Sequence, residues 1–225
     1  MRKITVLLAE DHMVVREGFR KMLELEHDFE IVGEAQDGRQ AVMLAKKLRP
    51  AVVLMDIAMP LLNGLEATRQ VLKALPGINV LMLSAHSDDA YVASAIEAGA
   101  KGFLLKQTSA HEVCRAVREI HGGKTFFSPA ISRRLSHLRP TPSGQTRNAT
   151  GKSEQLTSRE MEVLQLIAEG KANKQSALEL GIGIKTVEKH REHLMQKLDI
   201  HDTAGLTRYA ISMGIIESSV QLTIV

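Results

Sequence analysis

Residues 52–60 read Val-Val-Leu-Met-Asp-Ile-Ala-Met-Pro, a short apolar run that ends on a single acid, Asp56. A run of aliphatic residues without polar alternation favours a strand buried on both faces, as in parallel sheets covered by helices. Comparable runs recur through the first half of the chain. We therefore expect five strands, at Ile4–Ala9, Glu30–Ala35, Val52–Met55, Val80–Leu83 and Gly102–Leu105.

The segments between these runs have apolar residues at spacings of three and four, the pattern of amphipathic helices. The predicted helices cover Val14–Leu25, Gln40–Leu48, Leu65–Leu75, Ala90–Ala98 and Ala110–Ile120. Five alternating units of strand and helix predict an α/β fold with a parallel sheet and right-handed crossovers. Ligands of such folds bind beyond the carboxyl ends of the strands.

Five polar residues fall at or just beyond the ends of these strands: Glu10, Asp11, Asp56, Ser84 and Lys106. Three neighbouring carboxylates repel one another, and a divalent cation relieves that cost; hard oxygen ligands with room for water suit Mg²⁺. Asp56 is then a candidate nucleophile for a phosphoryl group, whose oxygens Lys106 would neutralise and Ser84 would bind through its hydroxyl. Singly, the two leading acids could be helix caps and the lysine a solvated surface residue. Their joint placement favours the phosphate site.

Residues 1–122 resemble the receiver domain of bacterial response regulators, which implies a flavodoxin-like fold with a five-stranded parallel sheet. The motifs that carry the resemblance are Leu54-Met-Asp56-Ile-Ala-Met59-Pro60, Asn63-Gly64, Leu83-Ser84-Ala85 and Gly102-Phe103-Leu-Leu-Lys106. One departure is Gln107, where many receivers have proline after the lysine. A cis bond without proline costs about 3–4 kcal/mol, so we do not expect one there.

The resemblance also implies roles for individual residues. Asp11 and Asp56 would bind Mg²⁺ directly, Ala58 would lend a backbone carbonyl, and Glu10 would act through water. Phe103 would be the aromatic that changes rotamer when the hydroxyl of Ser84 moves toward the phosphoryl group. Taken alone, a phenylalanine in a strand is more simply a core residue. The phosphoryl donor would be a sensor histidine kinase.

The net charge of +3 is unevenly distributed. Residues 1–121 hold 15 Lys and Arg against 16 Asp and Glu, residues 152–225 hold 9 against 10, and residues 122–151 hold 5 against none. The excess therefore lies in a linker, 123–151, where we expect a short helix at about 128–139 followed by a flexible tether of about 20 Å. Nucleic-acid contacts by residues 152–225 must come from locally clustered cations.

The cysteine content and hydropathy indicate a cytoplasmic protein. Cys114 is the only cysteine, so no internal disulfide can form, and its amphipathic surroundings favour a core position. Glu10 and Asp11 end the first apolar run far short of a signal-peptide core. No segment approaches the roughly 20 apolar residues of a membrane span.

Residues 152–225 read as an all-α domain of four helices that contains a helix-turn-helix. A capping box at 157–160 opens the first helix, Asn173 is expected to cap a second helix that ends at Leu180, and Gly181-Ile-Gly183 makes a tight turn. A third helix, Lys185–Leu198, and a last one, about 203–213, follow. The third presents a mixed polar face that could enter a major groove or simply be solvated. That face carries Lys185, Glu188, Lys189, Glu192 and Gln196.

This second part is very similar to the LuxR-type domain of the NarL/FixJ subfamily of response regulators. The matching residues are Leu156-Thr-Ser-Arg-Glu160, Val163-Leu164, Ile167-Ala168-Glu169-Gly170, Asn173-Lys174, Lys185-Thr186-Val187, His190 and Lys197-Leu198. The resemblance adds Lys174, Thr186 and His190 to the DNA-binding residues. It also implies a DNA-bound homodimer paired around Ala204–Ile211, an inverted-repeat operator in double-stranded DNA, and a receiver that masks the reading helix until Asp56 is phosphorylated.

Four positions depart from the LuxR-type pattern. Ser176 stands where an apolar residue is common, and Gly183 replaces a typical serine cap. Glu188 and Glu192 occupy reading-face positions where lysine is frequent. Acid beside phosphate weakens nonspecific affinity, whereas a glutamate can accept a hydrogen bond from cytosine. We therefore expect weaker, more sequence-dependent DNA binding.

Two other classes of function remain open from the sequence. The first half could be an aspartyl phosphohydrolase or a nucleotide-binding domain, but residue 58 is alanine where such hydrolases have a second acid, and no glycine-rich loop follows the first strand. The receiver could instead gate DNA binding through a protein or a small ligand without being phosphorylated. The favoured interpretation is a transcription regulator rather than an enzyme.

Overall fold

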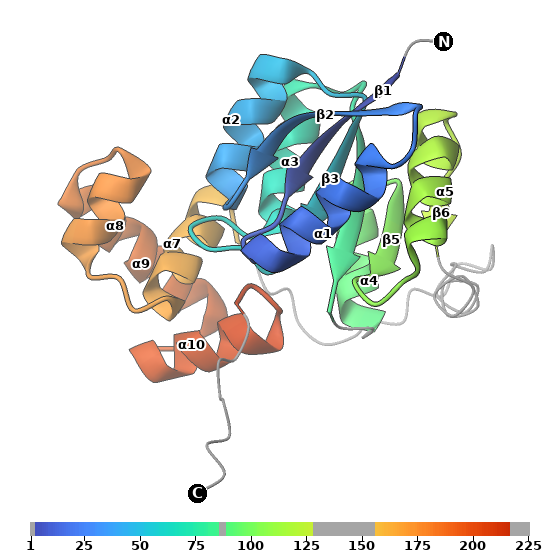
Figure 1. The fold of residues 1–225 in the computed structure, drawn as a ribbon. Helices are drawn as coiled ribbons and strands as arrows, with labels where there is room; N and C mark the ends of the chain where they lie inside the picture. The colour runs from blue at the N-terminus through green and yellow to red at the C-terminus, as the bar shows by residue number, and fades with distance from the viewer. Residues whose placement is uncertain (1–2, 86–88, 128–155, 217–225) are drawn as a thin grey trace, which may run out of the picture.

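The structure is a computed structural model, which describes residues 3–85, 89–127 and 156–216. Its first part alternates strands and helices (Figure 1). The strands are β1 (Ile4–Ala9), β2 (Phe29–Ala35), β3 (Val52–Asp56), β4 (Asn79–Ser84), β5 (Gly102–Leu105) and β6 (Phe126–Phe127). The helices are α1 (Met13–Glu24), α2 (Gly38–Leu48), α3 (Gly64–Ala74), α4 (Asp89–Glu97) and α5 (Ala110–His121).

All strands pair in parallel, in the order β2-β1-β3-β4-β5-β6. Helices α1 and α5 cover one face of the sheet, and α2, α3 and α4 cover the other (Figure 1). The apolar side chains of each group form a separate core with the face that they cover. The predicted doubly covered parallel sheet is therefore confirmed. The order places β1 and β3 side by side, so the residues that follow them lie at one edge of the sheet.

The prediction of five strands was wrong by one. β6 consists of two residues only, and it pairs Phe126 with Gly102 and Phe127 with Phe103. Two residues are too few to show strand periodicity, which explains why the sequence pattern does not reveal it. Phe126 is buried against the core shared with α5, so this short strand closes the edge of the sheet beside β5.

The second part has four described helices: α7 (Ser158–Ala168), α8 (Asn173–Leu180), α9 (Ile184–Leu198) and α10 (Thr203–Ser212). They enclose their own core, in which Val163, Leu166, Val187, Leu194 and Leu206 are fully buried. α8 and α9 meet through Gly181, whose φ of +63° suits a residue without a side chain. The predicted all-α helix-turn-helix unit is confirmed.

Two smaller predictions have different outcomes. Asn173 is not the cap of α8 but its first helical residue; Ala172 is the cap, and its N–H donates to the Gln175 side chain at 2.9 Å. The capping box of α7 is present as predicted, with Thr157 and Glu160 exchanging hydrogen bonds. The linker helix expected at 128–139 lies outside the described residues.

Candidate phosphoacceptor site and DNA-reading face

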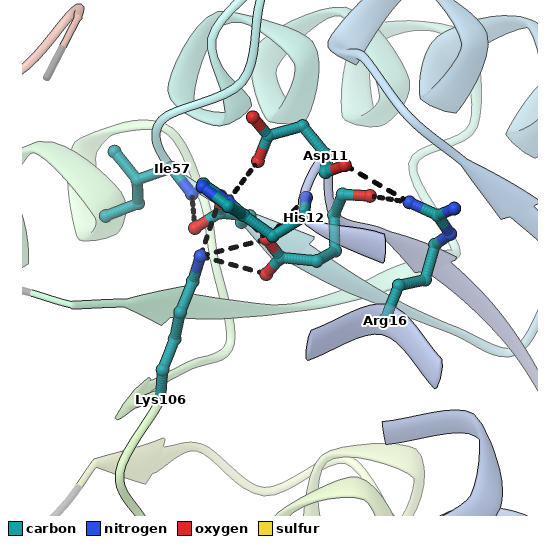
Figure 2. Close-up of polar contacts among 7 residues, drawn as sticks. Asp11, His12, Arg16, Ile57 and Lys106 are labelled. Carbon is teal, nitrogen blue, oxygen red and sulfur yellow. Dashed lines mark hydrogen bonds and ion pairs between the residues drawn. The ribbon is translucent and has the colours of Figure 1, made fainter. Parts of the chain in front are cut away.

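The acidic residues meet where the strands end. Asp56 is the last residue of β3, Glu10 directly follows β1, and both are almost fully buried. Lys106, just beyond β5, reaches between them: its Nζ lies 2.9 Å from Glu10 Oε2 and 3.0 Å from Asp56 Oδ2 (Figure 2). The structure thus brings together three of the predicted site residues through one ammonium group.

Desolvation and charge crowding dominate the electrostatics of Asp56. Burial, together with the neighbouring charge of Glu10, raises the pKa of Asp56 to about 7, although Lys106 opposes the shift. The Ile57 N–H donates to Asp56 Oδ1 at 2.9 Å, which fixes the carboxylate plane. Because burial and Glu10 disfavour the ionised form of Asp56, a cation bound beside it would stabilise that form. This is consistent with the predicted cation site.

Oxygen atoms in the acidic pocket are suitable for a hard cation. Glu10 Oε2, Asp11 Oδ1 and Asp56 Oδ2 are buried, and no described donor is aligned to make a hydrogen bond with them, although Lys106 and His12 lie within ion-pair distance. Side-chain ligand atoms of Glu10, Asp11 and His12 lie within 4.8 Å of one another. Carboxylate oxygens are the hard ligands that Mg²⁺ prefers. The residues present therefore fit the predicted ion.

His12 and Arg16 are two site neighbours that were not predicted from the sequence. The Nδ1 of His12 lies 2.9 Å from Asp11 Oδ1, and this carboxylate raises the pKa of the imidazole. Arg16 is buried beside the acidic turn, where its Nη1 donates to the carbonyl of Glu10 at 2.7 Å (Figure 2). Its Nε donates to Glu34 at 3.1 Å. The position of Arg16 in the first turn of α1, shortly after Glu10 and Asp11, was the feature of the sequence that could have indicated its role.

The structure places the other predicted receiver residues in β4, β5 and the loop after β3. Ser84 ends β4 and is buried, and Phe103 is fully buried in the core beneath α2, α3 and α4. Ala58 is partly exposed in the loop after β3. No described peptide bond is cis, and the bond before Gln107 follows this rule, as expected.

The reading face of α9 is open to solvent. Val187 and Leu194 are fully buried, whereas Lys185, Thr186, Glu188, Lys189, Glu192 and Gln196 are exposed. His190 is half-buried on the same helix, and Lys174 is exposed on α8. The described part of the receiver does not cover this face, so the structure gives no support to the expectation that the receiver directly masks the reading helix. The receiver instead contacts α7, the end of α8 and the end of α10.

A buried acidic pocket at the strand ends of a parallel α/β domain, joined to a helix-turn-helix, defines a signal-responsive transcription regulator. The models of two protein families match the chain. One is described as "Response regulator receiver domain" and covers residues 6–118, and the other as "Bacterial regulatory proteins, luxR family" and covers residues 154–210. The chain belongs to the LuxR-type response regulators.

Individual relatives agree with this assignment over nearly the whole chain. The transcriptional regulatory protein LiaR of Bacillus subtilis is 42% identical over 208 residues, covering 92% of this chain and 96% of LiaR. The oxygen regulatory protein NreC of Staphylococcus carnosus is 35% identical over 214 residues, covering 94% and 99%.

Solved structures give the same result. RcsB of Salmonella typhimurium, studied for its conformational dynamism in DNA interaction, matches with a TM-score of 0.56 at 26% identity, over 94% of this chain and 100% of that one. ChrA, the response regulator of a heme-sensing two-component system, matches with a TM-score of 0.52 at 31% identity, over 96% and 100%. None of the described helices is long and apolar enough to cross a bilayer.

Proposed function

We propose that Asp56 is the phosphoacceptor and that its phosphorylation by a sensor histidine kinase controls sequence-specific DNA binding by this regulator. The observation that carries the proposal is the single ammonium of Lys106 placed 3.0 Å from Asp56 and 2.9 Å from Glu10 in a buried pocket. We assign Asp11, Asp56 and the carbonyl of Ala58 as Mg²⁺ ligands, with Glu10 acting through water. The proposed setting is the cytoplasm.

The chemistry is a phosphoryl transfer between two protein side chains. An Asp56 carboxylate oxygen attacks the phosphorus of a kinase phosphohistidine, so that an O–P bond forms as the N–P bond breaks. The imidazole leaves in its neutral form and keeps the proton already on its other ring nitrogen. Bound Mg²⁺ supplies charge neutralisation on the phosphoryl oxygens. Lys106 contributes a second positive charge, and Ser84 can donate its hydroxyl to the same oxygens. Water later hydrolyses the acyl phosphate, so the domain turns over only its own modification.

The output is DNA binding by a homodimer. One related structure contains two RcsB dimers bound to two parallel DNAs, and that protein matches this chain with a TM-score of 0.57 at 26% identity, over 94% of this chain and 99% of that one. In this chain we assign pairing to α10 around Ala204–Ile211, where Ala204 and Ile211 are exposed. Base and phosphate contacts would come from the α9 face and Lys174. Two paired reading helices predict an inverted-repeat site.

Acetyl phosphate with Mg²⁺ tests the assignment of Asp56. The full chain is expected to take up one phosphoryl group that base or hydroxylamine removes, seen by intact mass, and Asp56→Asn is expected to take up none. Failure of labelling in the presence of a chelator would support the Mg²⁺ assignment. Turnover of an external phosphate ester would instead favour a hydrolase, and the absence of any label would favour a receiver that acts through a protein or small ligand.

A further inference from the structure

A fully buried glutamine joins the two domains beside the phosphoacceptor. Gln165 of α7 is 0% exposed. Its Nε2 donates to the Met59 carbonyl at 2.8 Å, and its Oε1 accepts from the backbone N–H of Asn63 at 2.7 Å and from Asn63 Nδ2 at 3.2 Å. The partners lie in the loop 57–63, which connects Asp56 to α3. One side chain of the DNA-binding domain therefore satisfies both a donor and an acceptor of this loop.

A second residue of α7 extends the contact. Glu169 Oε1 accepts from the Leu61 N–H at 2.9 Å and from Gln165 Nε2 at 2.8 Å. Leu61 has a φ of +65°, a conformation that is rare for a residue with a side chain, and its side chain packs against the core of the DNA-binding domain. A strained residue of the loop is thus held in place by the other domain.

The same loop is tightly coupled to Asp56. The N–H of Gly64 donates to the carbonyl of Ile57 at 2.8 Å, which closes the loop into a ring. A methyl group on Gly64 would lie only 1.8 Å from the carbonyl oxygen of Asp56, so the end of the loop packs directly on the phosphoacceptor backbone. Asn63 also caps α3 by accepting from the Glu66 N–H at 3.0 Å. A shift at Asp56 is therefore transmitted to the atoms that Gln165 binds.

We propose that Gln165 is a latch: it holds the DNA-binding domain on the unphosphorylated geometry of loop 57–63, and it resists phosphorylation of Asp56 in return. This inference rests on the proposed phosphorylation of Asp56. Hydrogen bonds of 2.7–2.8 Å between buried groups tolerate little displacement, because a buried donor or acceptor left without a partner is costly. Coupling between two sites is reciprocal at equilibrium, so a latch that modification releases must disfavour the modified state while it is closed. We expect the closed latch to slow labelling as well, because it opposes the movement of the loop.

The latch restrains the domains without covering the DNA-reading face. The exposed side of α9 leaves direct masking without support, whereas the end of α10 is packed on the receiver: a methyl group on Gly214 would lie 2.0 Å from the ring of Tyr91 in α4. α10 is the helix assigned to pairing. Opening the latch would free α10 to reorient and pair, which links the modification to a two-fold DNA complex.

Gln165→Ala in the full chain tests the latch, and Gln70→Ala is a matched control. Gln70 Nε2 also crosses between the domains, donating to Glu162 at 2.8 Å, but from α3 and without touching the loop. With acetyl phosphate and Mg²⁺, Gln165→Ala is expected to be labelled at Asp56 at least about fivefold faster than wild type, and to bind DNA more tightly when unphosphorylated. Gln70→Ala is expected to stay within about twofold of wild type for both quantities.

Three further results would decide the matter. Glu169→Ala should change both quantities in the same direction by a smaller factor, and it replaces Gln165→Ala if circular dichroism shows that the latter is unfolded. Normal labelling of wild type with unchanged rate and affinity in Gln165→Ala and Glu169→Ala would overturn the latch alone. A wild-type chain that takes no label at Asp56 would overturn the proposed function as well.

Discussion

A single buried guanidinium supports the acidic turn of the candidate site. Arg16 is 7% exposed and donates to the carbonyl of Glu10 at 2.7 Å, and Glu34 accepts from its Nε. Glu10 therefore contacts two cations: its carboxylate pairs with Lys106, and its backbone carbonyl accepts a hydrogen bond from Arg16. Its contribution is structural, because the guanidinium contacts the backbone of the turn and not the carboxylates of Glu10 or Asp11.

Replacing this arginine tests the support. Arg16→Met keeps the length of the side chain but leaves the buried carbonyl of Glu10 without its donor, so we expect the free energy of unfolding in urea to fall by about 1–3 kcal/mol. Arg20→Met is the control, since Arg20 pairs with the same Glu34 from a position 40% exposed, and its loss should cost less than about 1 kcal/mol. Equal effects of the two substitutions would show that the buried donor is unimportant.

A prediction about stability concerns Ser176 of α8, the first helix of the helix-turn-helix. Ser176, where the family pattern commonly has an apolar residue, is 1% exposed, and its Oγ has no hydrogen-bond partner among the described residues. Burying a hydroxyl without a partner is unfavourable, and alanine is also the better helix former. Ser176→Ala should therefore raise the stability of the second domain by about 1 kcal/mol, measured by thermal unfolding. A lower melting temperature would show that the hydroxyl is satisfied in solution.

The charge of α9 gives a prediction about DNA affinity. Glu192 is exposed on the predicted reading face, where its negative charge would repel DNA phosphate. Glu192→Lys should strengthen binding to nonspecific DNA and steepen the dependence of log affinity on log salt by about 0.9 for each additional phosphate that the protein neutralises. Glu17→Lys makes the same charge change at an exposed position of α1, and it should leave the slope unaltered. Identical slopes for wild type and Glu192→Lys would place this residue away from the DNA backbone.

The sequence predicted elements best where a pattern repeats over many residues. Among the elements that the structure describes, β1 and β5 have their predicted ends, and the others differ from the predicted bounds by one or two residues at one or both ends. Ends are set by local hydrogen bonds such as the side chain of Asp37, which caps α2 by accepting from Gln40 N, and periodicity does not report these. β6 was missed because its two residues form a strand only through pairing with β5.

The site was foreseeable in part for a similar reason. Successive strands of a parallel sheet bring their carboxyl ends to one edge, so Glu10, Asp56 and Lys106 could be grouped from their positions alone. Gln165 could not, because its contacts with Met59 and Asn63 join residues more than a hundred positions apart in different domains. Nothing in the periodicity of α7 distinguishes a polar residue that faces another domain from one that faces water.

At the scale of the whole molecule, the two domains share an interface made by α7 and the ends of α8 and α10, and the exposed side of α9 lies outside this interface. We therefore predict that phosphorylation changes how two chains come together on DNA and does not uncover a hidden reading surface. The phosphorylated chain should therefore form dimers at concentrations where the unmodified chain is monomeric. Analytical ultracentrifugation of the two forms measures this difference.

The most direct test is DNA affinity of the full chain with and without modification. A duplex selected from a random pool by the chain treated with acetyl phosphate and Mg²⁺ serves as probe, and fluorescence anisotropy gives the dissociation constant. We predict that the treated wild type binds at least about tenfold more tightly than the untreated chain, and that Asp56→Asn shows no difference. Equal affinities for wild type with and without a verified phosphoryl group on Asp56 would contradict the proposed switch.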